Sequence, residues 1–387
     1  MRKEEQGMIR YRLSQSSDME GLIDHINMIF SMLRTPHNFE EMLPKVYGKE
    51  HRIDDMHVIA EEEDGRIGGC LGMYVFPLRV CDTVLRVGYL GSMAVHPRVR
   101  GQGTMGTLMR KQIERGYELG LDLMVLGGQR QRYQRSGFET GGAGYVYSIS
   151  RANVRHALAD TDAGDISFRT MAQEDVPAML CLYDRQVVAG ARREDNFIAT
   201  LKSYRRDAWM ILRADKPVGY ISATADGQTI GEIVLEEAAL ILPAIKAWVE
   251  QRQVKNLHLS AAPYDSVLGG LLAPICESFS LNPSIMLRVL KPETVLPAYM
   301  KLQNTMHPLS DGRVVLGWEG NGAYEFRVSG GEITVRKTEE APHDTLSQID
   351  FHQLIFGYNR FAAPKIQAEI PENWFPLPVY IPEPDSF

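Results

Sequence analysis

The most constraining feature of this chain is a basic, glycine-rich stretch at residues 95–106, VHPRVRGQGTMG. An apolar run at residues 89–95 leads into it, and a helical pattern of apolar residues follows. Glycine has no Cβ atom, so the backbone N–H groups of such a turn can converge on one point without steric cost. The first turn of a helix adds free N–H groups and the positive end of its dipole. The stretch therefore predicts a strand, a turn and a helix N-terminus that together bind an anion such as a pyrophosphate.

The spacing of residues within this stretch narrows the choice of phosphate-bearing ligand. A nucleotide P-loop needs GxxxxGK[ST], and a dinucleotide fold needs GxGxxG with an acidic residue about 20 positions on. The P-loop pattern is absent from residues 95–106, and the GxGxxG spacing of residues 101–106, GQGTMG, does not by itself specify a dinucleotide fold. Residues 98–103, RVRGQG, match R-x-x-G-x-G, and this segment resembles the acyl-CoA loop of the GNAT acetyltransferases. An ordinary strand-to-helix turn would explain this motif if it stood alone.

A second segment carries the same resemblance. Residues 132–138, RYQRSGF, match the GNAT pattern aromatic-Tyr-x-x-x-Gly-Phe, except that Arg132 replaces the usual aromatic residue. An apolar strand at residues 121–126 precedes this segment. Before that strand, three- and four-residue steps predict a helix with one buried face, made of Met105, Leu108, Met109, Ile113 and Tyr117. Two family segments in this order predict a GNAT domain over residues 1–150.

The chain after residue 150 repeats the pattern of the chain before it. Predicted strands at residues 9–13, 56–61, 66–76 and 84–95 have counterparts at 166–170, 209–212, 218–222 and 230–235. A helix around residues 239–249 and a strand at 256–261 complete the comparison. We therefore expect a second copy of the fold at residues 151–290. Glu236 and Glu237 replace the basic glycine turn and would repel a pyrophosphate, so this copy is not expected to bind CoA.

Residues 291–387 have a different order of predicted strands and helices from both copies. Three short strands are predicted at 313–318, 322–328 and 332–336, with tight turns at the Asn-Gly and Gly-Gly pairs between them. A helix is expected around residues 346–356, with either Asp344 or Ser347 as its cap. Residues 374–387 carry four prolines among aromatic and apolar residues, which predicts an extended arm docked on the body.

Composition excludes several classes of protein. The 387 residues carry a net charge of −7, with 44% hydrophobic and 24% charged residues, which is typical of a soluble globular protein and argues against nucleic acid as a partner. The four cysteines are scattered without a C-x-x-C pair, so neither a metal site nor a disulfide framework is expected. No apolar stretch of about 18 residues occurs. We expect a cytoplasmic protein with no membrane partner.

The whole arrangement resembles the Eis-type (enhanced intracellular survival) acetyltransferases. This resemblance implies an α/β fold class with mixed sheets: tandem GNAT folds followed by a small α+β domain similar to sterol carrier protein. The implied domains are 1–150, catalytic; 151–290, a degenerate copy; and 291–387, the third domain with its aromatic and proline-rich arm. It further implies a homohexamer, acetyl-CoA as the acetyl donor, and acetylation of amines, including aminoglycosides for some members.

Site residues are carried over from the resemblance position by position. Main-chain contacts to the pantetheine fall on Met93, Ala94 and Val95. The pyrophosphate loop falls on Gly101, Gln102, Gly103, Thr104, Met105 and Gly106, with Arg98 and Arg100 beside it. Gly128 and Gln129 match further cofactor contacts. Tyr133 falls on the general acid, and the free carboxylate of Phe387 on the general base.

These residue types suit transfer of an acetyl group to an amine. A tyrosine hydroxyl, with an ordinary pKa near 10, is protonated at neutral pH and can donate to a departing thiolate. A carboxylate can take the proton of an ammonium or hold the cation. We therefore expect an acetyl-CoA-dependent N-acetyltransferase acting on a small cationic amine such as an aminoglycoside or polyamine. A lysine side chain of a peptide, or a non-catalytic module that binds acetyl-CoA or lipid, are the alternatives.

Overall fold

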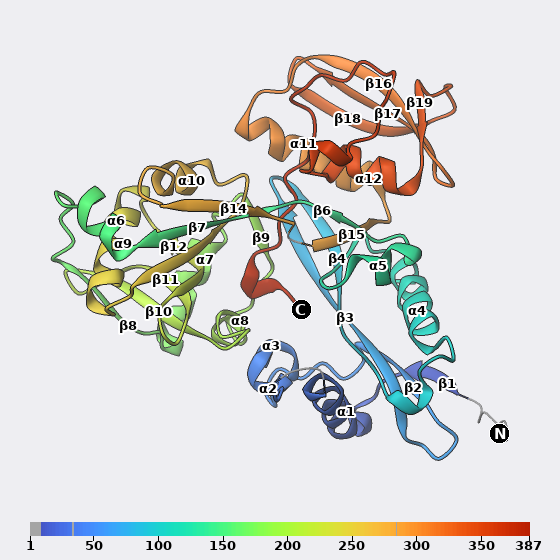
Figure 1. Ribbon diagram of the computed structural model, residues 1–387, viewed down its shortest axis with the longest axis horizontal. Helices are drawn as coiled ribbons and strands as arrows, with labels where there is room; N and C mark the ends of the chain where they lie inside the picture. Colours follow the sequence, from blue (N-terminus) through green and yellow to red (C-terminus); the bar gives the residue numbers. More distant parts are fainter. Residues whose placement is uncertain (1–8, 33–34, 284) are drawn as a thin grey trace.

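The computed structural model describes residues 9–32, 35–283 and 285–387 and contains three β-sheets, each with its own helices (Figure 1). The mixed α/β class agrees with the sequence prediction. None of the helices in these ranges is long and apolar enough to cross a membrane.

The first sheet holds the glycine-rich stretch. Its strand order is β1-β2-β3-β4-β5-β15-β6, and β9 pairs with the end of β3. The bounds are β1 (Arg10–Leu13), β2 (His57–Glu61), β3 (Ile67–Val80), β4 (Thr83–Val95), β5 (Leu123–Leu126), β6 (Glu139–Gly141), β9 (Val188–Gly190) and β15 (Ile285–Val289). Along this path only β4 and β5 are parallel.

Helices cover both faces of the first sheet. On one face, α1 (Met19–Ser31), α2 (Phe39–Met42) and α3 (Pro44–Tyr47) pack on residues such as Ile59 and Cys70. On the other, α4 (Thr104–Glu118) packs on their neighbours Val58 and Leu71. Alternate residues of each strand point to opposite faces, so one strand serves both cores. The short helix α5 (Arg130–Tyr133) follows β5.

The buried face of α4 differs from the one expected at its C-terminal half. Leu108 and Met109 are buried as predicted, but Tyr117 is exposed, while Gln112 and Gly116 are buried instead. Gln112 is satisfied because its amide donates to the carbonyls of Met56 and Leu71. Gly116 is required by close approach, since a Cβ there would lie 2.8 Å from the Met124 sulfur. The hydrogen bonds of Gln112 and the close approach of β5 to Gly116, rather than the spacing of apolar residues, therefore determine which face of α4 is buried.

The second sheet repeats the topology of the first. Its order is β14-β7-β13-β12-β11-β10-β8, and again only one neighbouring pair, β12 and β13, is parallel. The strands are β7 (Gly144–Ser150), β8 (Ile166–Thr170), β10 (Arg206–Arg213), β11 (Lys216–Thr224), β12 (Thr229–Leu235), β13 (Asn256–Ala261) and β14 (Ser278–Asn282). Its helices are α6 (Arg151–Ala157), α7 (Val176–Tyr183), α8 (Phe197–Leu201), α9 (Ile241–Gln251) and α10 (Ser266–Leu272).

The repeat extends to single side chains. Where β1 leads into α1, Arg12 binds both carboxylate oxygens of Asp18 at 2.6 and 2.8 Å. Where β8 leads into α7, Arg169 binds Asp175 in the same way at 2.6 and 2.7 Å. Each aspartate also accepts a backbone N–H three residues before it. The same turn chemistry therefore starts both halves of the chain.

The two sheets exchange one strand each. β15 belongs to residues 151–290 in sequence but lies between β5 and β6 of the first sheet. β7 belongs to residues 1–150 in sequence but lies between β13 and β14 of the second sheet. Each of the two expected domains therefore contributes one strand to the sheet of the other. The exchange ties the two halves together through backbone hydrogen bonds.

The third sheet has the order β18-β17-β16-β19 and packs against α11 (Pro292–Met306) and α12 (Gln348–Phe356). Its strands are β16 (Gly312–Trp318), β17 (Gly322–Ser329), β18 (Glu332–Thr338) and β19 (Asp344–Leu346). Ser347, one of the two expected caps, accepts the Asp350 N–H at the start of α12. The expected helix and three expected strands are present.

The proline-rich arm runs from the third sheet to the junction of the other two, where the chain ends (Figure 1). Trp374, Leu377, Val379 and Phe387 are buried, so the arm docks on the body as predicted. The short turn η7 (Glu383–Asp385) lies just before its end. This path brings Phe387 to the first sheet, next to β3 and β4.

Candidate active site

The glycine-rich turn has the conformation that its sequence predicts. Gly101 and Gly103 have φ angles of +78° and +77°, a region that residues with a Cβ rarely adopt, and a Cβ on either would meet nothing within 4 Å. Gly103 caps α4, whose first intrahelical bond runs from Thr107 N–H to Gly103 C=O. The preceding N–H groups of the first turn thus have no intrahelical partner and are available to an anion.

A cavity of about 390 Å³ lies over this turn. Seven of the expected cofactor residues line it: Met93, Val95, Arg100, Gly101, Gly103, Thr104 and Met105. Ile29, Val99 and Arg132 complete its wall. Free N–H groups, a helix N-terminus and Arg100 make this a cavity for an extended anionic ligand.

The other expected cofactor residues near the turn do not line this cavity. Arg98 is bound to Glu62, with its Nη2 2.7 Å from Oε1, and lies 3.0 Å from the His96 ring. Gln102 donates to the Arg98 carbonyl within the turn. Ala94 is buried in the core shared with α1, and Gly106 faces open space. The acidic partner of Arg98 is the residue that directly follows β2, which the R-x-x-G-x-G spacing cannot reveal.

The gap beside β4 results from a bulge. Ser92 and Met93 oppose Leu71 alone, because the register shifts between the pairs Gly72–Gly91 and Cys70–Ala94. Ser92 has a φ of +54°, which turns the rest of β4. β5 pairs with β4 only as far as Leu126 and then ends. The two parallel strands therefore diverge where Met93 to Val95 begin.

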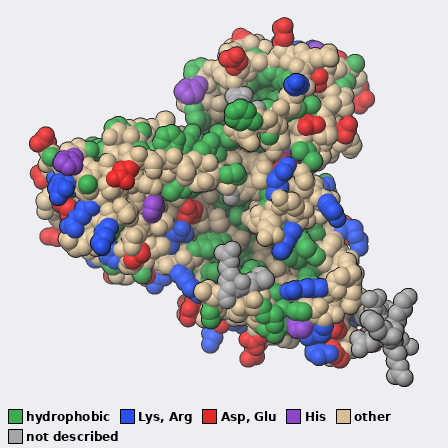
Figure 2. Space-filling view, in the orientation of Figure 1, with side chains coloured by type: hydrophobic (Ala, Val, Ile, Leu, Met, Phe, Trp, Pro, Cys, Tyr) green, Lys and Arg blue, Asp and Glu red, His purple; other side chains and the backbone are tan. Residues whose placement is uncertain are grey.

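A second cavity, of about 300 Å³, lies in this gap and shares Met93 and Arg132 with the first. It brings together four further expected residues: Gly128, Gln129, Tyr133 and Phe387. The remainder of its lining is largely apolar, including Phe30, Leu71, Leu90, Met109 and Leu126. In the space-filling view, hydrophobic side chains gather in the hollow where the parts of the molecule meet (Figure 2).

Tyr133 ends α5 and lies half-buried in this second cavity. Gly128, with a φ of +118°, makes room for it: a Cβ there would lie 3.2 Å from the tyrosine ring. Burial raises the pKa of Tyr133 above its ordinary value of 10, and the nearby Arg132 lowers it by less. The hydroxyl is therefore protonated at neutral pH and can donate a proton.

The ring of Phe387 lies in a slot between two glycines. Gly72 and Gly91 oppose each other on β3 and β4, and a Cβ on either would lie within 3.0 Å of that ring. The aromatic rings of Tyr47 and Tyr74 border the slot, at 6.1 and 6.3 Å between centroids. The main-chain oxygen of Phe387 lies over Gly91, so the end of the residue faces the second cavity.

A buried polar chain leads to the same cavity. The Tyr47 hydroxyl donates to Ser92 Oγ at 2.7 Å and lies 2.9 Å from His57 Nε2. Because the one phenolic hydrogen goes to Ser92, the histidine Nε2 must be the donor to the Tyr47 oxygen. Burial lowers the pKa of His57 to about 3, so the ring is neutral. Ser92, which lines the cavity, is thereby held by a bond to the buried Tyr47.

Sequence reasoning missed Tyr47, His57 and Ser92, whose spacing forms no motif. A signal did exist for the Phe387 slot. Gly72 and Gly91 stand inside two adjacent strands, where glycine often marks close approach of another group. The described residues include no group of three or more His, Cys, Asp or Glu that could hold a metal ion.

These observations can be set beside known proteins. Residues 10–141 match the acetyltransferase (GNAT) domain family. The matched range covers the glycine-rich turn, β4, β5 and Tyr133, but not β15, which lies between β5 and β6 in the same sheet. A search of curated proteins gives no match.

Three crystal structures resemble the chain well beyond residues 10–141. A GCN5-related N-acetyltransferase from Kribbella flavida has 16% identity and a TM-score of 0.65, covering 89% of this chain and 88% of its own. A probable N-acyltransferase from Enterococcus faecalis V583 has 15% identity and a TM-score of 0.66, with 90% of each chain covered. Eis1 from Mycobacterium abscessus has 16% identity and a TM-score of 0.61, covering 89% and 88%. At these identities the likeness concerns the fold.

Proposed function

We propose that the protein is an acetyl-CoA-dependent N-acetyltransferase that acts on a primary amine. The observation that carries the proposal is that two neighbouring cavities share Met93 and Arg132 in their linings. One cavity has the features of an anion site, and the other holds a protonated tyrosine and the end of Phe387. An acyl donor that carries phosphate groups at one end and a thioester at the other needs both cavities.

The residues present fit acetyl-CoA. The N–H groups from Gly103 to Met105, with Arg100, would hold its pyrophosphate, and the edge of β4 at Met93 to Val95 would hold the pantetheine. Gly128 and Gln129 would border the thiol end. When bound, acetyl-CoA supplies an activated acetyl group.

In the proposed reaction, the carboxylate of Phe387 takes a proton from the acceptor ammonium. The neutral nitrogen then forms a bond to the acetyl carbonyl carbon, and the carbon–sulfur bond breaks. Tyr133 gives its proton to the departing sulfur, and the tyrosinate that remains takes up the second proton that the nitrogen loses as the amide forms, so that the products are the N-acetylated acceptor and CoA with a free thiol. The largely apolar lining excludes water, which strengthens the contact of the Phe387 carboxylate with the ammonium and the contact of the Tyr133 hydroxyl with the sulfur.

The lining of the second cavity bears on the acceptor. None of its fourteen lining residues, all in the described part of the chain, is Asp or Glu, and Arg132 adds a positive charge. The carboxylate of Phe387 would be the anionic group there, which suits one ammonium at a time. We therefore infer an acceptor that presents a single amine on an apolar stem, such as a lysine side chain or an aliphatic amine. The further ammonium groups of an aminoglycoside or polyamine would have to lie outside this cavity.

Three further expectations from the Eis-type resemblance stand as proposals: a homohexamer, a cytoplasmic location, and a third domain similar to sterol carrier protein. Light scattering coupled to gel filtration tests the first. The third sheet supports the last only in being a small α+β unit. A lipid-transfer assay with the whole protein tests whether that unit binds lipid.

The function is tested by thiol release from acetyl-CoA with a panel of lysine peptides, aliphatic amines, polyamines and aminoglycosides. We expect turnover with at least one acceptor, and a fall in kcat of about 100-fold or more in Tyr133→Phe, the range for losing a general acid. Tyr117→Phe, which alters an exposed ring on α4, should leave kcat unchanged. A form extended by two residues after Phe387 should also lose turnover, because its carboxylate is displaced.

Each alternative has its own outcome in this assay. Turnover untouched by the extension would remove the Phe387 carboxylate from the mechanism. Binding of acetyl-CoA without turnover on any acceptor would favour the non-catalytic module. Absence of acetyl-CoA binding would contradict both readings.

A further inference from the structure

The last five residues of the chain are held by both halves of the molecule. From the first half, the Lys45 ammonium donates to the Pro384 carbonyl, and Tyr89 bonds with Ser386. From the second half, Arg206 and Ser260 bind the carboxylate of Glu383. Each contact comes from a different element, so the segment is fixed from several sides.

At the centre of these contacts is a buried ion pair between Arg192 and Asp385. Arg192 Nε lies 2.9 Å from Oδ1 of Asp385, and Nη2 lies 3.0 Å from Oδ2. The two side chains are only 2% and 6% exposed. The Tyr183 hydroxyl donates to Oδ2 of the same carboxylate at 2.8 Å, and its ring lies 3.7 Å from the guanidinium carbon.

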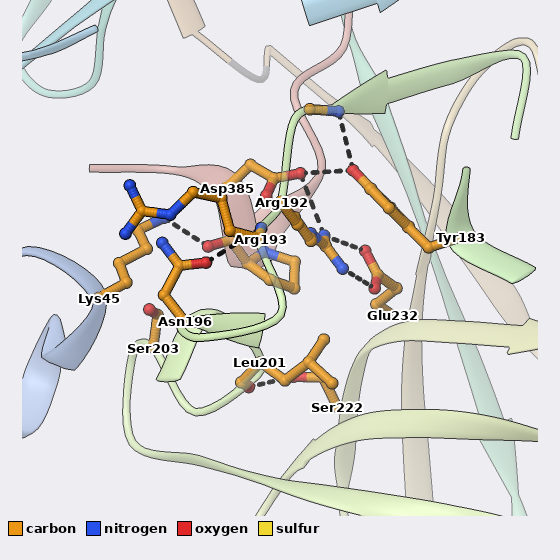
Figure 3. A network of polar contacts seen from close by, with 12 residues as sticks. Lys45, Tyr183, Arg192, Arg193, Asn196, Leu201, Ser203, Ser222, Glu232 and Asp385 are labelled. Carbon is orange, nitrogen blue, oxygen red and sulfur yellow. Dashed lines mark hydrogen bonds and ion pairs between the residues drawn. The ribbon is translucent and has the colours of Figure 1, made fainter. Parts of the chain in front are cut away.

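The second sheet holds the arginine in place. Glu232, on β12, binds Arg192 in bidentate fashion at 2.6 and 2.7 Å. The nearby Arg192 charge holds the pKa of Asp385 below its ordinary value, against the effect of burial. Asp385 is therefore ionised at neutral pH, and Figure 3 shows it between Arg192 and Tyr183.

A buried pair of this kind is a poor source of stability, because the cost of removing two charges from water offsets most of their attraction. What it does provide is geometry: a bidentate arginine accepts a carboxylate in one orientation. Asp385 is two residues from Phe387, and two residues span at most about 7 Å. Fixing Asp385 thus confines the end of Phe387 to the neighbourhood of its slot.

We propose that Arg192 and Asp385 are positioning residues that fix the carboxyl end of Phe387 in the second cavity. The second sheet, which lacks the anion-binding turn, would then take part in the reaction through the arm rather than through a ligand of its own. This inference rests on the proposed function for its kinetic consequence, but its structural consequence can be measured alone.

The test compares Asp385→Asn with Asp175→Asn in the 387-residue chain. The asparagine keeps the shape of the aspartate but loses its charge, and Arg192 retains Glu232 as a buried counterion, so the fold is expected to survive. Asp175 is the matched control: its side chain is 7% exposed and accepts two bonds from Arg169, but it does not touch the arm.

Two readouts are taken from each variant. The first is kcat beside the Kd of acetyl-CoA. For Asp385→Asn we expect kcat to fall at least tenfold with Kd changed less than twofold, and for Asp175→Asn we expect neither to change by more than twofold. The second is the rate at which a carboxypeptidase releases Phe387, which we expect to rise at least tenfold in Asp385→Asn alone.

Unchanged release of Phe387 and unchanged kcat in Asp385→Asn would overturn the inference while leaving the proposed function intact. If the wild type acetylates nothing, the proposed function fails, and the release rates still decide whether Asp385 holds the arm. Equal changes in both variants would show general destabilisation and also overturn the inference. Should Asp385→Asn fail to fold, Tyr183→Phe removes one bond to the same carboxylate and should raise release at least threefold.

Discussion

Gly72 and Gly91 illustrate how single residues shape this site. Both stand in the middle of strands, where glycine weakens a sheet, and neither has a positive φ that would require it. The tertiary structure explains why both positions are glycine, because the Phe387 ring occupies the space that their side chains would fill. Small residues on the sheet and an aromatic residue at the chain end are two parts of one contact.

Gly91→Ala should therefore displace Phe387. A Cβ at this position would lie 2.8 Å from the ring and 3.0 Å from the main-chain oxygen of Phe387, closer than van der Waals contact allows. We expect kcat in the thiol-release assay to fall at least tenfold. Gly21→Ala, on α1, is the control, since its Cβ meets nothing within 4 Å and kcat should not change. Equal activity of both variants would show that the slot does not matter.

Buried histidines make stability depend on pH. Burial lowers the pKa of His25 to about 4, of His57 to about 3 and of His352 to about 4. In the unfolded chain these rings titrate near 6.5, so the unfolded state binds more protons below that pH. Stability is therefore full above pH 6.5 and is lost as the pH falls from 6.5 toward 4.

His352→Gln tests this linkage. Removing one such histidine should reduce the loss of unfolding free energy between pH 7 and pH 5 by about 2 kcal/mol, from 1.36 kcal/mol per pH unit. Urea unfolding at the two pH values measures it. His307→Gln, at an exposed position, should leave the pH dependence as in the wild type. An unchanged pH dependence in His352→Gln would contradict the burial argument.

At the scale of elements, the strand, turn and helix at β4, Gly101–Gly103 and α4 form a local unit. The positive φ angles of its glycines and the start of α4 follow from neighbouring residues. The bulge at Ser92 does not, because it depends on how β4 pairs with β3. Motif recognition therefore predicted the turn and the start of α4, while the gap that leads to Tyr133 required the sheet.

A comparison of Gly103→Ala with Gly65→Ala should distinguish the effect of backbone strain on stability from the effect of the turn on acetyl-CoA binding. The φ of +77° costs an alanine about 1–2 kcal/mol, and the new Cβ would crowd the anion site. Gly65→Ala, in the β2–β3 hairpin, has a φ of +80° and the same open surroundings, so it carries the same strain away from the site. Both variants should lose similar stability, but only Gly103→Ala should weaken acetyl-CoA binding, by tenfold or more in calorimetry. Equal affinities would remove the turn from the CoA site.

At the scale of the whole molecule, the strand exchange links the two halves through backbone hydrogen bonds. β15 covers the edges of both β5 and β6, and β7 would have no sheet if the first half stood alone. The arm adds a second tie, from the third sheet across to the junction of the others. A division at residue 150 cuts through this arrangement.

Residues 1–150 expressed alone should not fold into a stable monomer. The missing β15 would leave apolar strand edges unpaired, which favours aggregation. Gel filtration and thermal unfolding measure this, and co-expression with residues 151–387 should restore a soluble complex. A monomeric fragment with a cooperative transition would show that the exchanged strand is dispensable.

Local chemistry determined much of this protein from its sequence. Glycine, proline and apolar periodicity act over a few residues, so the glycine-rich turn before α4, the repeated strand order, Ser347 as one of two possible caps and the docking of the aromatic arm could be predicted from the sequence. The catalytic roles of Tyr133 and Phe387 remain predictions from a resemblance. Their presence in one cavity is an observation that the sequence alone could not supply.

Only the tertiary structure decided which distant groups meet. The apolar pattern of β15 suits either sheet, and nothing near Arg98 in the sequence indicates Glu62 as its partner. Asp385 lies 193 positions from Arg192, a separation at which no local pattern carries information. Such contacts depend on the path of the whole chain, because burial and pairing are satisfied between elements rather than within them.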